Sequence, residues 1–346
     1  MHIVLKTPDI CSGINDWILR SRALPLTLHI QGAYNVIEPG LSLVDTLSHC
    51  SNRLQSLSLV DVSLPILGGL QDNNFQYHRL TQLRIFMDQF DQPLSLLNPT
   101  ASPERIEIDS MSLRSLQISW NRLISITADC FDLEDLTQLF QQASQMTFCQ
   151  VSHLSHTPSD FSMPPIILHR LKTLDLHRSP YWDVKPDLLD SLTLPCLQEV
   201  VIYETISLTQ LPALLRRSSC PLTSLTLFLD SIHFPFDELG PLPGVTDLVI
   251  GAWDEVDAMM RLLLEGFLPD LRHLTLRLSS FMVLWNRGVI PLLLDRKRPR
   301  LDDANGGRFH KFIVVDQDWE FEWNSEVWER LKKLNATRRE DGFEFF

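Results

Sequence analysis

Two short motifs contain side chains that could bind a metal ion or a phosphate group. His153 and His156, in the sequence HLSH, are three residues apart, a spacing that on a helix would aim both imidazoles at one metal. The adjacent Thr157 and Pro158 instead indicate a loop, and no third ligand lies nearby, so the metal interpretation is the less favoured one. Residues 295–300, DRKRPR, could form a nuclear import signal or a phosphate patch, but such a run is more often a solvated loop.

The sequence contains no common motif of a nucleotide-binding or hydrolytic site. GxGxxG, the P-loop, GxSxG and HExxH are all absent. The cysteines are scattered without a CxxC pair, which favours reduced thiols over a zinc site or a disulfide framework. They are Cys11, Cys50, Cys130, Cys149, Cys196 and Cys220. We therefore expect no cofactor, no metal and no enzymatic activity; an unrecognised catalytic site in residues 88–108 is the alternative.

The composition is that of a folded, acidic protein. Hydrophobic residues make up 44% of the 346-residue chain and charged residues 21%, which allows a sizeable core and argues against disorder. The net charge of -13 disfavours binding to a nucleic-acid backbone. No apolar run approaches the roughly 18 residues of a membrane helix, and the N-terminus lacks the pattern of a signal peptide. We expect a soluble protein of the cytoplasm or nucleus, with no nucleic-acid or membrane partner.

A framework of the form LxxLxL recurs along most of the chain. The copies are Leu26/Leu28/Ile30, Leu54/Leu57/Leu59, Leu80/Leu83/Ile85, Leu113/Leu116/Ile118, Ala143/Met146/Phe148, Leu171/Leu174/Leu176, Leu197/Val200/Ile202, Leu222/Leu225/Leu227, Val245/Leu248/Ile250 and Leu271/Leu274/Leu276, with Phe309/Phe312/Val314 as a drifting last copy. From Leu59 to Leu276 the last framework positions are separated by 26, 33, 30, 28, 26, 25, 23 and 26 residues. Most of these spacings fall in the range of about 20–29 that is typical of leucine-rich repeats.

Each copy predicts a short strand with one buried face, because its last two framework residues alternate with polar ones. Burying three framework side chains yields about 1.5–3 kcal/mol each. The entropy of ordering the rest of the repeat offsets most of this gain, so repeats must stack and share a core. The predicted fold is α/β: a leucine-rich-repeat solenoid, or horseshoe, with a parallel sheet on its concave side and helices and loops on its convex side.

The solenoid is expected to occupy residues 1–280, as about nine or ten irregular repeats. Helical patterns connect some of its strands, at residues 134–142, 187–192, 211–217 and 254–266. Residues 281–346 are predicted to cap the end of the same solenoid, which must be shielded from water. An amphipathic helix at residues 325–334 would be part of this cap.

Residues that alternate with the framework positions are predicted to point away from the core and to form a binding surface. Tyr203 and Phe228 should lie close together on adjacent strands, flanked by His177 and Glu199. Exposed aromatic side chains beside charges are typical of protein-binding hot spots. The alternative is that loops or the cap fold over these side chains. The candidate residues are Arg84, Phe86, Asp175, His177, Glu199, Tyr203, Phe228, Asp247, His273 and Arg277.

Four phrases of the sequence resemble those of fungal F-box proteins with degenerate leucine-rich repeats. They are WILRSRALPLTLHI (17–30), LLDSLTLPCLQEVVI (188–202), LPALLRRSSCPLTSLTL (211–227) and LPDLRHLTLRL (268–278). The resemblance implies that the repeats recruit a protein for ubiquitination, while an F-box binds a Skp-type adaptor of a cullin–RING ligase. Too few residues precede Trp17 for the F-box, so we expect it to be missing, through truncation or loss.

The resulting expectation is a non-catalytic, monomeric protein-interaction scaffold whose partner is an unidentified protein. A Skp-type adaptor is expected as a partner only if the complete protein carries an F-box that is missing from this sequence. The alternative is a degenerate remnant, or a truncated gene product, that has no partner.

Overall fold

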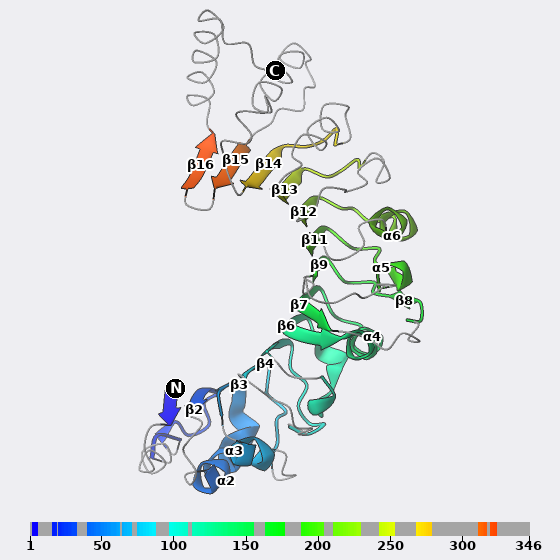
Figure 1. Cartoon of the computed structure of the whole chain (residues 1–346). Coiled ribbons are helices and arrows are strands. Elements are labelled where there is room, and N and C mark those ends of the chain that lie inside the picture. The colour runs from blue at the N-terminus through cyan, green and yellow to red at the C-terminus, as the bar shows by residue number, and fades with distance from the viewer. Residues whose placement is uncertain are drawn as a thin grey trace, which may run out of the picture. The chain divides into compact units, whose positions relative to one another are not determined.

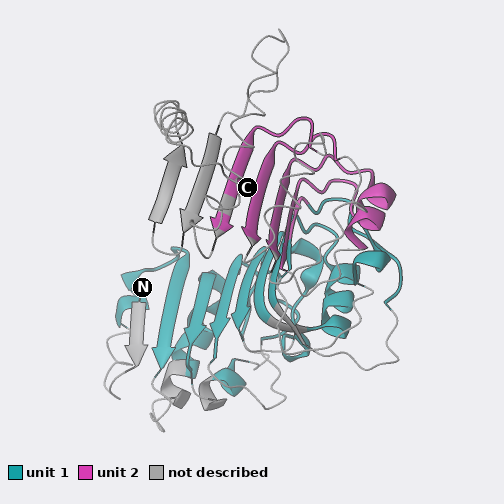
Figure 2. Cartoon of the chain, turned by 45° about the horizontal axis from the view of Figure 1, so that its top comes forward, with its two compact units in different colours: residues 1–171, 175–193 teal, residues 172–174, 194–346 magenta. Residues whose placement is uncertain are grey.

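The computed structural model shows an α/β chain with a large, mostly parallel sheet and few helices (Figure 1). The α/β class expected from the sequence is thereby confirmed. The structure describes residues 2–5, 16–18, 20–32, 40–62, 64–70, 75–87, 97–109, 113–155, 163–176, 188–203, 210–229, 242–252, 268–278, 311–316 and 319–323. The chain divides into two compact units (Figure 2), which we call the first unit (residues 1–171 and 175–193) and the second unit (residues 172–174 and 194–346).

The first unit contains strands that pair in parallel in the order of the sequence. They are β1 (His2–Leu5), β2 (Leu26–Gly32), β3 (Leu54–Val60), β4 (Gln82–Phe86), β5 (Arg105–Asp109), β6 (Ser125–Asp132) and β7 (Phe148–Ser155). A separate parallel pair is formed by β8 (Ile166–Ile167) and β10 (Leu192–Thr193). The boundary between the units falls within β9 (Thr173–Leu176).

The second unit continues the same strand-by-strand arrangement. Its strands are β11 (Glu199–Tyr203), β12 (Ser224–Leu229), β13 (Asp247–Ala252), β14 (His273–Leu278), β15 (Lys311–Asp316) and β16 (Trp319–Trp323). Pairing is parallel from β11 to β15, and only β16 runs antiparallel to its neighbour. The predicted last framework copy lies on β15, where Phe312 and Val314 pair with Leu274 and Leu276. Most of the predicted cap at 281–346 lies outside the described residues.

Helices occur in several of the connections between strands. They are α2 (Gly40–Cys50), α3 (Leu64–Gly69), α4 (Leu133–Gln142), α5 (Leu188–Ser191) and α6 (Leu211–Ser218), with 3-10 turns η1 (Ser51–Arg53), η2 (Leu113–Ser115) and η3 (Trp120–Arg122). The helices predicted at 134–142 and 211–217 are confirmed, and the segment 187–192 holds the short α5. The helices predicted at 254–266 and 325–334 lie outside the described residues.

Helix α6 shows how the sequence sets its own ends. It starts with Pro212 in the first turn, where a missing N–H costs no helical hydrogen bond. It ends at Ser219, which adopts a left-handed φ of 46° and donates its N–H to Leu215 O at 2.9 Å. Leu211 and Leu214 are fully buried, so this helix contributes one apolar face to the core.

Framework side chains line up across the sheet and form the core. In the second unit Val200, Leu225, Leu248 and Leu274 occupy one row of register, and each is 3% exposed or less. In the second unit the residues between framework positions, Val201, Thr226, Val249 and Thr275, are half-buried. This alternation is what a two-residue period produces when only one face of a sheet is covered.

Two framework copies were assigned wrongly from the sequence. Leu113, Leu116 and Ile118 do not form a strand: residues 113–115 form the turn η2, in which Leu116 N–H donates to Leu113 O at 2.9 Å. The strands in this part of the chain are β5 and β6. The copy at Ala143/Met146/Phe148 is displaced by three residues, because Cys149 and Val151 are the buried partners of Ile126 and Ala128.

The corrected positions make the repeat more regular than the sequence indicated. The last framework residues from β4 to β9 are Ile85, Ile108, Ala128, Val151 and Leu176, which are 23, 20, 23 and 25 residues apart by subtraction of their numbers. The irregular spacings of 33, 30 and 28 arise because the framework positions of β5, β6 and β7 are not leucines. In β5 the two framework positions are isoleucines.

Candidate protein-binding surface

The outward face of each unit is the set of strand residues that alternate with the buried framework. In the first unit, side chains in the middle of this face hydrogen-bond to one another from strand to strand. These contacts are His29 Nδ1 with Ser58 Oγ at 2.9 Å, Arg84 with Glu107 at 2.7 Å, Thr127 with Gln150 at 3.4 Å, and Gln150 with Asp175 at 3.0 Å. A partner covering this row would have to desolvate polar groups that already have protein partners.

The middle of the outward face of the second unit has a different composition. Here the in-register residues are Val201, Thr226, Val249 and Thr275, all half-buried and none of them charged. Branched side chains of this kind give a smooth surface with little rotamer freedom to lose. The energetic cost of covering this row is therefore lower than for the polar row of the first unit.

Beside this row lies a second register row that holds two aromatic rings. Tyr203 pairs with Phe228, Phe228 with Gly251, and Gly251 with Arg277. The rings of Tyr203 and Phe228 stack with centroids 4.2 Å apart and planes 12° from parallel. Their predicted proximity on adjacent strands is confirmed. The prediction that Glu199 flanks them is wrong, because Glu199 pairs with Ser224, four residues before Tyr203 at the other end of the strand. We call the set Tyr203, Phe228, Gly251 and Arg277 the aromatic shelf.

Gly251 makes room for the ring of Phe228. A Cβ at this position would lie 2.4 Å from Phe228 Cδ1 and 3.0 Å from Cε1, so the ring lies directly beside the glycine backbone. A glycine inside a strand often marks such a close approach. Gly251 is not among the predicted site residues, although a glycine inside a strand pattern was the available signal.

Arg277 completes the shelf on the far side of Gly251. Its guanidinium carbon lies 5.6 Å from the centroid of the Phe228 ring, within the range of a cation–π interaction. The side chain is exposed. The ring therefore has Tyr203 on one side and a cation on the other.

Polar residues occupy the opposite end of the same strands. His273 Nδ1 lies 2.6 Å from Asp247 Oδ1, and Thr246 donates to Asp247 Oδ2 at 2.6 Å. Partial burial alone would raise the pKa of Asp247, but the hydrogen bonds from Thr246 and His273 and the charges of His273 and Arg272 lower it below its ordinary value of 3.8. Glu199, on β11, accepts a hydrogen bond from Thr173 at 3.3 Å.

The lowered pKa of Asp247 predicts a pH-dependent contribution to stability. A carboxylate with a depressed folded-state pKa stabilises the fold at neutral pH and loses this contribution as the pH falls through its folded pKa. The stability difference between the wild type and Asp247→Asn should thus be largest near neutral pH and fade below about pH 4. Urea unfolding at several pH values measures it, and a difference that does not change with pH would contradict the expectation.

The predicted site residues fall into separate groups. Tyr203, Phe228 and Arg277 meet on the aromatic shelf, and Asp247 contacts His273. Arg84, Phe86 and Asp175 belong to the first unit, where Arg84 forms an ion pair with Glu107 and Asp175 accepts a hydrogen bond from Gln150. His177 lies outside the described residues, as do residues 295–300 and the side chains of His153 and His156.

The buried cysteines are poor nucleophiles. Burial, followed by the nearby charge of Asp175, raises the pKa of the Cys149 thiol well above its usual range. Burial also raises the pKa of Cys50 to about 11, against the opposing effects of Arg53 and a backbone hydrogen bond. Both thiols are protonated at neutral pH, whereas cysteine chemistry needs the thiolate. Within the described part of the chain, no group of three or more His, Cys, Asp or Glu could hold a metal ion.

Comparison with known proteins does not assign the chain to a family. No family model matches it, and neither the curated proteins nor the solved structures include a match. Among the residues that the structure describes, no helix has the length and apolarity needed to cross a membrane. The aromatic shelf is therefore the main basis for a functional proposal.

Proposed function

We propose that the chain is a non-catalytic protein-interaction scaffold built as a leucine-rich-repeat solenoid, and that the aromatic shelf of its second unit binds a protein partner. The observation that carries this proposal is the stack of Tyr203 on Phe228, extended by Arg277, on the outward face of the sheet. Tyrosine and arginine are among the residues most enriched in binding hot spots. The rings are already held against each other, so little side-chain entropy remains to be lost on binding.

The resemblance to fungal F-box proteins supports a narrower version of this function. In that version the repeats select a protein for ubiquitination, and a Skp-type adaptor is recruited through an F-box. Strand spacings of 20 to 26 residues along the corrected framework are compatible with such repeats. Mixing the purified chain with a Skp-type adaptor tests whether these residues bind the adaptor without an F-box; we expect no complex, because the sequence contains no recognisable F-box.

The double variant Tyr203→Ala plus Phe228→Ala is expected to weaken partner capture at least tenfold while leaving thermal stability nearly intact. Losing a hot spot costs about 2 kcal/mol or more of binding energy, whereas half-buried outward rings contribute little to the core. Quantitative affinity capture with mass spectrometry measures the first effect, and a thermal melt followed by circular dichroism measures the second.

Two further variants separate the shelf from general effects. Gly251→Ala keeps both rings but pushes Phe228 out of place, so it should also weaken capture. Phe148→Ala removes a half-buried outward aromatic residue of the first unit that is not part of the shelf, and it should leave capture unchanged. Unfolding of the double variant would show that the rings belong to the core, and unchanged capture would rule out the shelf as the binding surface.

A further inference from the structure

Arg277 is exposed and forms no ion pair with an acidic residue among those that the structure describes. Its recorded contact is with the Phe228 ring. By contrast, Arg84 pairs with Glu107, Arg114 with Glu134 and Asp135, and Arg122 with Glu104. The chain has 43 acidic residues against 30 basic ones, so partners for a guanidinium are abundant. Arg277 is instead held in position by an aromatic ring.

The geometry of this contact leaves the hydrogen-bonding edge of the guanidinium available. A cation–π contact engages the face of the planar group, whereas its N–H donors point outward in the plane. Two parallel N–H groups match the two oxygens of a carboxylate. The exposed edges of aromatic rings also carry partial positive charge. The shelf is therefore an electropositive rim on an acidic protein.

Three acidic residues of the same outward face stand more than a Debye length from Arg277 along the backbone. Glu320 on β16 is in the same register row but two strands away, beyond Val315, which is about 10 Å at 4.8 Å per strand. Asp247 and Glu199 are each four residues before the shelf position on their own strand, which is about 13 Å at 3.3 Å per residue. The Debye length at physiological ionic strength is about 8 Å. Asp247 is further engaged by His273 and Thr246.

We propose that the aromatic shelf recognises an acidic side chain, Asp or Glu, that stands next to an apolar side chain in an extended segment of a protein partner. The carboxylate binds the guanidinium of Arg277. The apolar side chain packs on the Phe228–Tyr203 stack and on the neighbouring uncharged row that contains Val249. This inference rests on the proposed function and specifies the chemistry of the partner.

A random linear peptide library displayed on phage and selected against the full chain tests the inference. The enriched peptides should carry Asp or Glu beside an apolar residue. For a synthetic copy of the strongest peptide, Arg277→Gln should raise Kd about ten- to hundredfold, as expected for loss of a hydrogen bond to a charged group. Arg277→Lys should restore only part of the affinity, because lysine cannot bind a carboxylate in bidentate fashion.

Matched variants make the outcome decisive. Arg122→Gln removes an exposed arginine whose charge is already neutralised by Glu104, and it should leave Kd unchanged. Arg277→Glu should shift a new selection toward Lys- and Arg-containing peptides. Enrichment of acid-free or basic peptides that still require Tyr203 and Phe228 would overturn the carboxylate inference while keeping the proposed function. Peptide binding that is insensitive to Tyr203, Phe228 and Arg277 would overturn both.

Discussion

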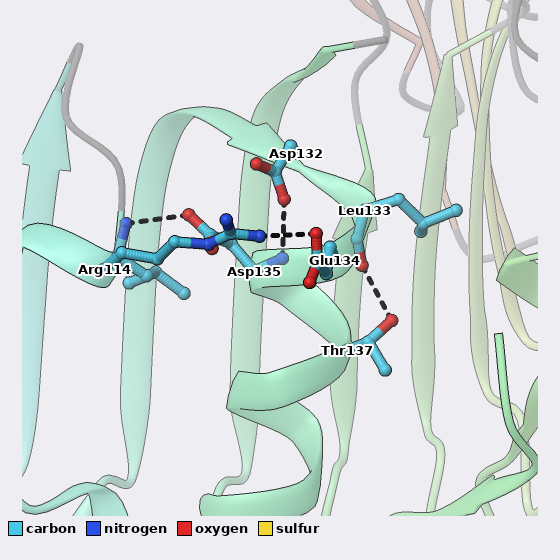
Figure 3. A network of polar contacts seen from close by, with 7 residues as sticks. Arg114, Asp132, Leu133, Glu134, Asp135 and Thr137 are labelled. Atoms are coloured by element: carbon cyan, nitrogen blue, oxygen red, sulfur yellow. Dashed lines mark hydrogen bonds and ion pairs between the residues drawn. The ribbon is translucent and has the colours of Figure 1, made fainter. Parts of the chain in front are cut away.

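Replacing Asp135 by alanine is expected to lower the free energy of unfolding by about 2–4 kcal/mol. Its side chain is 1% exposed and accepts hydrogen bonds from Leu113 N–H at 3.1 Å and from Arg114 Nε at 2.8 Å (Figure 3). Its removal leaves the buried Leu113 N–H without this acceptor, and it also takes a negative charge from the first turn of α4. Chemical denaturation monitored by circular dichroism measures the change.

Glu134→Gln is the matched control, because Glu134 binds the same arginine from the next position on the helix. Its carboxylate lies 2.5 Å from Arg114 but is 44% exposed, so water can replace the contact. Exposed ion pairs contribute about 0–1 kcal/mol, and we expect a change within that range. Equal losses in the two variants would show that the charge pair with Arg114, and not the buried acceptor, supports this corner of the first unit.

Leu225→Ala is expected to cost about 2–5 kcal/mol, the usual range for a truncated core leucine. Leu225 is 1% exposed and stands in register between Val200 on β11 and Leu248 on β13. Shortening it opens a cavity that three successive strands line. A urea titration at neutral pH provides the measurement.

Thr226→Ala tests the register of the same strand. Thr226 follows Leu225 directly but lies on the outward face between Val201 and Val249. Surface substitutions of this kind usually change stability by less than about 0.5 kcal/mol. If Thr226→Ala lowers the free energy of unfolding more than Leu225→Ala does, the buried and outward faces of β12 are exchanged. A register slip of one residue would cause this exchange.

The sequence by itself determined the α/β class, most of the buried framework and helices α4 and α6. Leu222, Leu225 and Leu227 are buried as their alternation predicts. The closeness of Tyr203 and Phe228 could also be predicted, because both follow the last framework leucine or isoleucine of successive strands. These features depend on the period of neighbouring residues along the chain, which is visible without any tertiary contact.

Only the tertiary structure decided which apolar segments near residue 113 become strands. Leu113 and Leu116 fit the leucine pattern better than Ile106 and Ile108, yet a carboxylate 22 residues further along binds the N–H of Leu113 in a turn. Such a contact has no periodic signature. The polar row of the first unit is likewise set by which strands pair, since it joins side chains from separate strands.

The aromatic shelf shows the same division within one site. The sequence placed Phe228 and Arg277 on the outward face, but their contact needs β13 between them to carry a glycine at the matching register position. Alternation along a strand is a local property, whereas contact across an intervening strand depends on pairing and on the space that its side chain leaves. For this reason the face could be predicted from the sequence, and the position of the guanidinium could not.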